Sequence, residues 1–174
     1  MSRISVFCVM LAVGCLTARA DEPSKSAVKK LAKEMADATI GGDYAKVIDY
    51  THPAGLKEAP GRKEAIERIE ALFKQMKDAG FSVTKYEVGD PGDFHTQGDN
   101  TFVVVPTSME MKSPAGKILD KSYLLGISSD RGKSWKFLDG SGFQNEESRD
   151  KVLPKMPATL KLPKKGKPEI IKDK

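Results

Sequence analysis

Tyrosine, histidine and aspartate side chains are the groups in this sequence best suited to acid–base chemistry. Phenol, imidazole and carboxylate groups can transfer protons, or hold a polar ligand, when they converge in a pocket. Tyr50 and His52 lie just before a proline, and Tyr86 and Tyr123 lie in segments with strand character. The candidate pocket-lining residues are Tyr50, His52, Tyr86, Met109, Met111, Tyr123 and Trp135.

These candidates also have ordinary structural interpretations. Met109 and Met111 are two residues apart, so both point to one face of a strand, where they would line an apolar pocket or pack in the core. His52 would cap a helix end or act as a base at a pocket mouth. A buried tyrosine usually bonds to a neighbouring backbone group. The sequence leaves these alternatives open and identifies no catalytic residue.

Several other chemistries lack the residues they need. The only cysteines, Cys8 and Cys15, lie in the first twenty residues, and only two histidines occur. No spacing typical of a metal site and no Gly-x-Ser-x-Gly motif is present. We therefore expect no thiol nucleophile, no metal site and no cofactor.

The N-terminus has the pattern of a cleavable signal peptide over residues 1–20. A positive start, a short apolar run and the sequence Ala18-Arg19-Ala20 define it, and Asp21 would begin the mature chain. The run is shorter than the roughly 20 residues that span a membrane. We predict an exported protein, periplasmic or extracellular and bacterial in type, with a lipid anchor at Cys15 as the minor alternative.

Positive charge is concentrated at the C-terminus. The chain carries 29 basic and 24 acidic residues, a net charge of +5. Residues 151–174 hold eight lysines against Glu169 and Asp173, so the body over 21–150 is mildly acidic. This argues against nucleic-acid binding, which requires a basic face on the domain itself. We predict a proline-containing, disordered basic tail over 151–174 that would attach to an anionic surface.

The positions of apolar residues predict three helices followed by strands. Helices are expected from Ser26 to Gly41-Gly42, over 44–51 after an Asp43 cap, and from Arg62 to Gly80. The loop over 53–61 could include a short strand. Strands are expected at 81–88, 101–111, 117–128 and 134–139, and Pro106 suggests a bulge or an edge position in the second of them. This order predicts one α+β domain over 21–150, with its core at about 26–142.

The chain resembles the nuclear transport factor 2-like superfamily over roughly residues 26–142. The resemblance is carried by Gly61-Arg62-Lys63-Glu64-Ala65-Ile66, by the helix–Gly–Gly–Asp–helix start and by Trp135-Lys136-Phe137. It implies three helices packed on a curved antiparallel sheet, a cone-shaped, cystatin-like roll whose wide end opens to a pocket. Ketosteroid isomerases in this group use an Asp base with Tyr and Asp donors. Tyr50, Tyr86, Tyr123, Asp49, Asp93 and Asp139 supply these residue types, but no motif selects among them.

A second, local resemblance concerns the segment Ser128–Trp135. Ser128, Asp130, Gly132, Ser134 and Trp135 fit the Asp-box pattern, which repeats in sialidases and other propellers. A single copy, after a helical N-terminal half, predicts a structural hairpin rather than a glycosidase. In it Asp130 would accept backbone N–H groups and Gly132 would supply a positive φ.

Two functions remain from the sequence, with a third less favoured. The first is a noncatalytic module that binds a small apolar or amphipathic ligand, or a protein. The second is a cofactor-independent isomerase, dehydratase or cyclase that uses pocket Tyr, His and Asp side chains. The third, based only on the Asp-box segment, is a polysaccharide-directed protein. A homodimer formed through the sheet is also left open, and no membrane span is expected.

Overall fold

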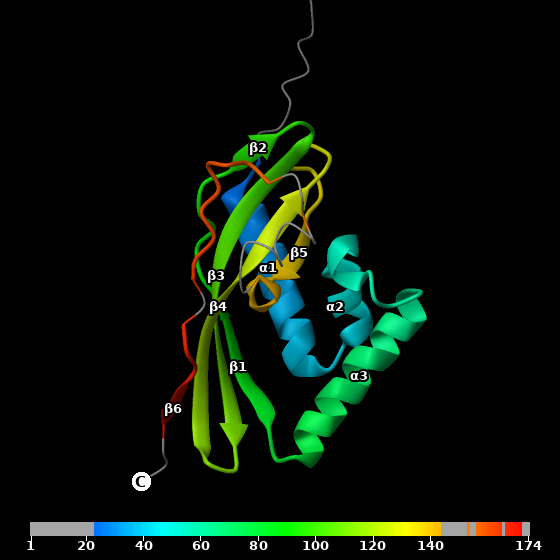
Figure 1. Cartoon of the computed structure of the whole chain (residues 1–174), viewed down its shortest axis with the longest axis vertical. Coiled ribbons are helices and arrows are strands. Elements are labelled where there is room, and N and C mark those ends of the chain that lie inside the picture. The colour runs from blue at the N-terminus through cyan, green and yellow to red at the C-terminus, as the bar shows by residue number, and fades with distance from the viewer. Residues whose placement is uncertain (1–22, 144–152, 154–155, 165, 172–174) are drawn as a thin grey trace, which may run out of the picture.

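The computed structural model describes residues 23–143, 153, 156–164 and 166–171 (Figure 1). The predicted signal peptide, residues 1–20, and the alternative anchor at Cys15 lie outside these residues. Three helices precede a six-stranded antiparallel sheet, which confirms the predicted α+β class. No described helix is long and apolar enough to cross a bilayer.

The first helix, α1 (Lys25–Gly41), packs against the sheet. The Ser24 side chain caps it by accepting the Ala27 N–H at 3.4 Å. Val28, Ala32 and Ala36 recur every four residues and are fully buried, so they form the face that contacts the strands. Gly42 ends the helix at φ 74°, a left-handed conformation that glycine adopts without strain.

Helix α2 lies beside α1, and α3 packs on the far side of α2, as Figure 1 shows. Asp43 caps α2 (Tyr44–Tyr50) by accepting the Lys46 N–H at 3.1 Å. The loop that follows forms a short 3₁₀ helix, η1 (Pro53–Leu56), so no strand lies there. Helix α3 (Arg62–Asp78) buries only Ala65 completely, and Leu72 in its predicted apolar stripe is 53% exposed.

Two long strands form the centre of the sheet: β3 (Asn100–Ser113) and β4 (Gly116–Ser128). Along β3 lie β1 (Ser82–Val88) and β2 (His95–Gln97); along β4 lie β5 (Lys136–Asp139) and β6 (Glu169–Ile171). A second 3₁₀ helix, η2 (Gly140–Gly142), follows β5 directly. The four predicted strands are present with small shifts at their ends, whereas β2 and β6 were not predicted.

Pro106 lies inside β3, where the register with β4 contains no bulge, but the other side of β3 has no strand partner at this residue, so the predicted edge position holds on that side. Its pairing with Tyr123 continues the unbroken register between β3 and β4. On its other side the pairing with β1 ends at Val88, and the Pro106 carbonyl accepts the Gly89 N–H at 2.8 Å. The nitrogen and carbonyl of one strand residue point to the same side. The missing N–H therefore faces a stretch where β3 has no strand partner.

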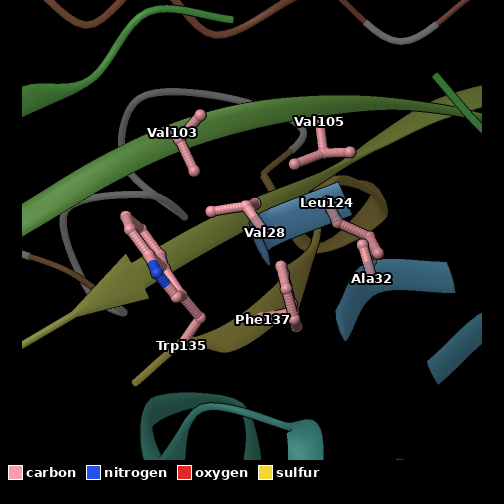
Figure 2. Close-up of a cluster of buried hydrophobic side chains, with 7 residues drawn as sticks. All are labelled: Val28, Ala32, Val103, Val105, Leu124, Trp135 and Phe137. Carbon is pink, nitrogen blue, oxygen red and sulfur yellow. The ribbon is translucent and has the colours of Figure 1, made fainter. Parts of the chain in front are cut away.

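The two faces of the sheet are covered by different parts of the chain. We call the side that contacts α1 the helix face; Figure 2 shows its core, where Val28, Ala32, Val103, Val105, Leu124, Trp135 and Phe137 converge. The opposite face carries Phe102, Tyr123, Leu125, Ile127 and Leu138. Alternation of side chains along β3 and β4 produces this division.

The opposite face is covered by the C-terminal segment, meaning the described residues between 153 and 171. Leu160 is only 7% exposed within the apolar cluster of this face, and Leu153, Met156 and Leu162 pack against the same cluster. Strand β6 then pairs with β4. The prediction of a disordered tail over 151–174 does not hold for these residues, because apolar side chains between the lysines and prolines contact the sheet.

Candidate functional site

A cavity of about 220 Å³ lies on the helix face, beside the core. The pairing register places Tyr86 opposite Met109, and Met109 opposite Asp120, so the three side chains point to the same side. β5 and η2 contribute the remaining wall. The lining residues are Tyr86, Thr107, Met109, Asp120, Ser122, Asp139 and Ser141.

Along β4 the helix face changes from apolar to polar. Leu124 is buried in the core, and Ser122 and Asp120 follow at steps of two residues on the same face. Asp120 is only 9% exposed. The Ser122 hydroxyl oxygen is buried and has no hydrogen-bond partner among the described residues. Because a buried hydroxyl without a partner is costly, this position favours a bound polar group.

Tyr86 supplies the phenol of the cavity. Burial raises the pKa of its hydroxyl far above the usual range, the Asp139 carboxylate raises it further, and a hydrogen bond with Thr107 opposes the rise. Tyr86 therefore keeps its proton at neutral pH and can donate a hydrogen bond to a ligand.

Asp139 is held in place by the turn that follows it. Its side chain accepts the Ser141 N–H at 2.6 Å and so caps η2. From the opposite face, the Tyr123 ring fills the space beside Gly140, where a Cβ atom would lie 2.6 Å from it. Burial, with a smaller contribution from Asp139, raises the pKa of Tyr123 to about 12. Tyr123 thus supports the cavity wall from behind.

The structure brings together only part of the predicted site. Tyr86 and Met109 line the cavity, and Met111 lies one step beyond Met109 on the same face. Tyr123 points to the opposite face, and Trp135 is 3% exposed in the core.

Tyr50 and His52 also lie away from the cavity. The Tyr50 hydroxyl donates to the Glu34 carboxylate of α1. The Nδ1 atom of His52 accepts the Ala54 N–H at 3.1 Å and caps η1. Burial lowers the pKa of His52, with a smaller effect from Lys57, so the neutral acceptor form is favoured. This geometry matches the capping interpretation of His52.

Four lining residues were not identified from the sequence: Thr107, Asp120, Ser122 and Ser141. A signal for two of them exists in the sequence. Asp120 and Ser122 occupy alternate positions in a strand that continues to Leu124, so they had to point inward with it. A polar residue at an inward strand position is a more specific sign of a site than an isolated tyrosine.

The segment Ser128–Trp135 forms a tightly bonded turn. Asp130 accepts the Lys133 and Ser134 N–H groups at 3.1 and 2.9 Å and the Ser134 hydroxyl at 2.6 Å. These bonds, led by Ser134, hold the pKa of Asp130 far below its usual range. Gly132 has φ 90° and donates to the Ser128 hydroxyl, while the Trp135 indole donates to the Gly132 carbonyl. All of these hydrogen bonds join residues within Ser128–Trp135, so they stabilise the turn.

A second, more open groove of about 350 Å³ lies between α2, η1 and the start of α3. Ile48, Pro53 and Leu56 form apolar parts of its wall. At its rim Arg62 makes two hydrogen bonds to Asp49, at 2.8 and 2.9 Å, which lower the pKa of that carboxyl group. The guanidinium group of Arg62 and the carboxylate of Asp49 therefore form an ion pair with each other at this rim.

Comparison with known proteins gives no match, either to a protein family model or to a curated sequence. Among the described residues, no group of three His, Cys, Asp or Glu side chains could hold a metal ion.

Proposed function

We propose that this protein is a noncatalytic binding module whose helix-face cavity holds a small amphipathic ligand. The observation that carries the proposal is the change along β4 from the sealed core at Leu124 to the buried, unpartnered Ser122 hydroxyl and the buried Asp120. Apolar side chains at positions 120 and 122 would stabilise the fold more than the buried polar groups that are present. Met109 offers an adaptable apolar wall, and Tyr86 and Asp139 offer hydrogen-bonding groups.

The binding proposal is tested by calorimetric titration with three eight-carbon probes: octan-1-ol, octylamine and octanoate. We expect at least one probe to bind saturably. The Met109→Trp variant should abolish this binding because the larger side chain fills the cavity. Glu110→Trp is the matched control, since the neighbouring side chain points to the other side of β3. Absence of saturable binding by all three probes, or equal binding by both variants, would contradict the proposal.

A second candidate function is favoured by the convergence of Tyr86, Asp120 and Asp139 on one cavity. A protonated phenol and a carboxylate can hold a carbonyl oxygen and move an adjacent proton, as in an isomerase. The test is turnover of a small β,γ-unsaturated cyclic ketone, followed by the ultraviolet absorbance of the conjugated product. An enzyme would lose kcat in Tyr86→Phe and Asp139→Asn, whereas the binding module shows no turnover at all.

We also propose that the protein is exported and belongs to the nuclear transport factor 2-like superfamily. The signal pattern in residues 1–20 supports export, and the order of three helices followed by an antiparallel sheet supports the family. Secretion of a fusion carrying residues 1–20, compared with one starting at residue 21, tests the export proposal. Retention of both fusions in the cytoplasm would contradict it.

Exposed lysines on the opposite face of the sheet favour contact with an anionic surface. Lys161, Lys164 and Lys167 of the C-terminal segment are exposed, as are Lys112 and Lys117 on the strands. We propose salt-sensitive binding to phospholipid vesicles that contain phosphatidylglycerol. Replacing Lys161, Lys164 and Lys167 by Gln should weaken sedimentation with these vesicles, and equal sedimentation with phosphatidylcholine vesicles would contradict the proposal.

A further inference from the structure

The cavity on the helix face has one sign of charge among its described lining residues. Asp120 and Asp139 contribute carboxylates, and no lysine, arginine or histidine lines it. Asp120 is nine-tenths buried, and the Ser122 hydroxyl beside it has no partner among the described residues. A ligand group that donates hydrogen bonds and carries positive charge would complement both features.

An apolar row continues from the cavity along the same face. The register places Val83 opposite Met111, Met111 opposite Ile118, and Ile118 opposite Ile170, so four strands contribute to one row. Met111 and Ile118 lie two residues from Met109 and Asp120, the adjacent row that lines the cavity. Paired side chains at this spacing point to the same face as the cavity.

This row is incompletely covered by the described residues. Val83, Met111 and Ile118 are half-buried, and Ile170 is 61% exposed. These incompletely covered apolar side chains, next to the buried Asp120 and the exposed Asp139, form a surface that is charged at one end and apolar at the other. An alkyl chain laid along the row would remove apolar area from water, at about 25 cal/mol per Å².

From these two features we infer that the ligand is a cationic amphiphile, with an ammonium head at Asp120 and Asp139 and an alkyl chain along Val83, Met111, Ile118 and Ile170. The inference rests on the proposed function of the cavity and specifies its ligand. Tyr86 and Ser122 would bond the head group, and Met109 would lie at the junction of head and chain.

The charge of the head group is tested with matched probes on the purified protein. We expect octylamine to bind about tenfold more tightly than octan-1-ol, and octanoate to bind least. Asp139→Asn should weaken octylamine about tenfold and octan-1-ol much less, while Glu110→Gln, on the other side of β3, should change neither. Equal affinity for the amine and the alcohol, or preference for octanoate, would overturn the inference while leaving the ligand cavity in place.

The alkyl part is tested with amines of increasing length. Affinity should rise from butylamine to octylamine in the wild type, and Ile118→Ser should reduce this rise without changing the affinity for butylamine. An affinity independent of chain length would overturn the role of the apolar row. Failure of every probe, neutral, anionic and cationic, would instead contradict the binding function itself, so the two failures are distinguishable.

Discussion

The two faces of the sheet are built from the same strands but differ in how completely they are covered. On the opposite face, apolar side chains from Phe102 to Leu138 lie under Leu160 and its neighbours. On the helix face, α1 covers the part around Val103 and Phe137, and beyond Leu124 the surface becomes the polar cavity. Burial in this protein therefore depends on which segment covers each strand position.

The covered apolar residues and the polar cavity residues also contribute differently to the stability of the fold. Residues that contact α1 or the C-terminal segment remove apolar area from water, which is the main favourable contribution to folding. Asp120 and the Ser122 hydroxyl oxygen are buried without removing apolar area from water, and this hydroxyl has no partner among the described residues. Substitutions that distinguish the covered core from the cavity therefore test the comparison directly.

The largest effect is expected in the covered part of the helix face. Phe137 is completely buried against α1 and β4. Phe137→Ala should lower the free energy of unfolding by about 3–5 kcal/mol, because it removes a large apolar side chain and leaves a cavity. Chemical denaturation followed by circular dichroism measures the change. A loss below about 1 kcal/mol would mean that this part of the helix face is not a packed core.

The next effect tests whether the C-terminal segment seals the opposite face. Leu160→Ala should cost about 2 kcal/mol, since its side chain is 7% exposed among apolar neighbours. Lys161→Ala, one residue along and exposed, is the matched control and should change stability little. Equal stability of both variants would show that the segment does not cover the sheet, and the two faces would no longer differ in this way.

Two serines of β4 provide a matched pair with opposite expected signs. The Ser128 hydroxyl accepts the Gly132 N–H and bonds to Asp130, both at 2.7 Å, so Ser128→Ala should cost about 1–2 kcal/mol. Ser122→Ala should raise stability by about 1 kcal/mol, because it removes a buried hydroxyl without a described partner. Thermal denaturation of both variants measures the difference. Destabilisation by Ser122→Ala would indicate that its hydroxyl is satisfied within the protein.

Much of the fold could be predicted because local patterns agree with the final packing. The Val28–Ala32 spacing, the Asp43 cap and the alternation along β3 and β4 each determine an element without long-range information. Strands β2 and β6 could not be found in this way. Each has three residues, and Glu169–Ile171 forms a strand only because β4 offers a free edge there.

The site was harder to predict because it depends on register across strands. Met109 and Tyr86 were selected by residue type, but their meeting with Asp120 depends on the pairing of β1, β3 and β4. Tyr123 was selected for the same reason as Tyr86, yet it points to the opposite face because its partner is Pro106. Only the pairing, including the irregularity between Val83 and Lys85, decides which tyrosine lines the cavity.

The smallest effect is expected where α2 meets the edge of the sheet, at His52. Its N–H donates to the Phe137 carbonyl at 2.8 Å, and its neutral Nδ1 caps η1. Because burial lowers its pKa in the folded state, the unfolded chain binds its proton first as the pH falls below about 6.5. His52 therefore favours folding above that pH and loses this contribution as the pH falls through its folded pKa.

His52→Asn isolates this contribution, because the Asn oxygen can still accept the Ala54 N–H but does not titrate. The free energy of unfolding, measured by denaturant titration between pH 8 and pH 5, should fall less in the variant than in the wild type. Because the capping bond is retained, the two proteins should be similar in stability at pH 8. An identical pH dependence in both would mean that His52 does not act through its buried neutral form.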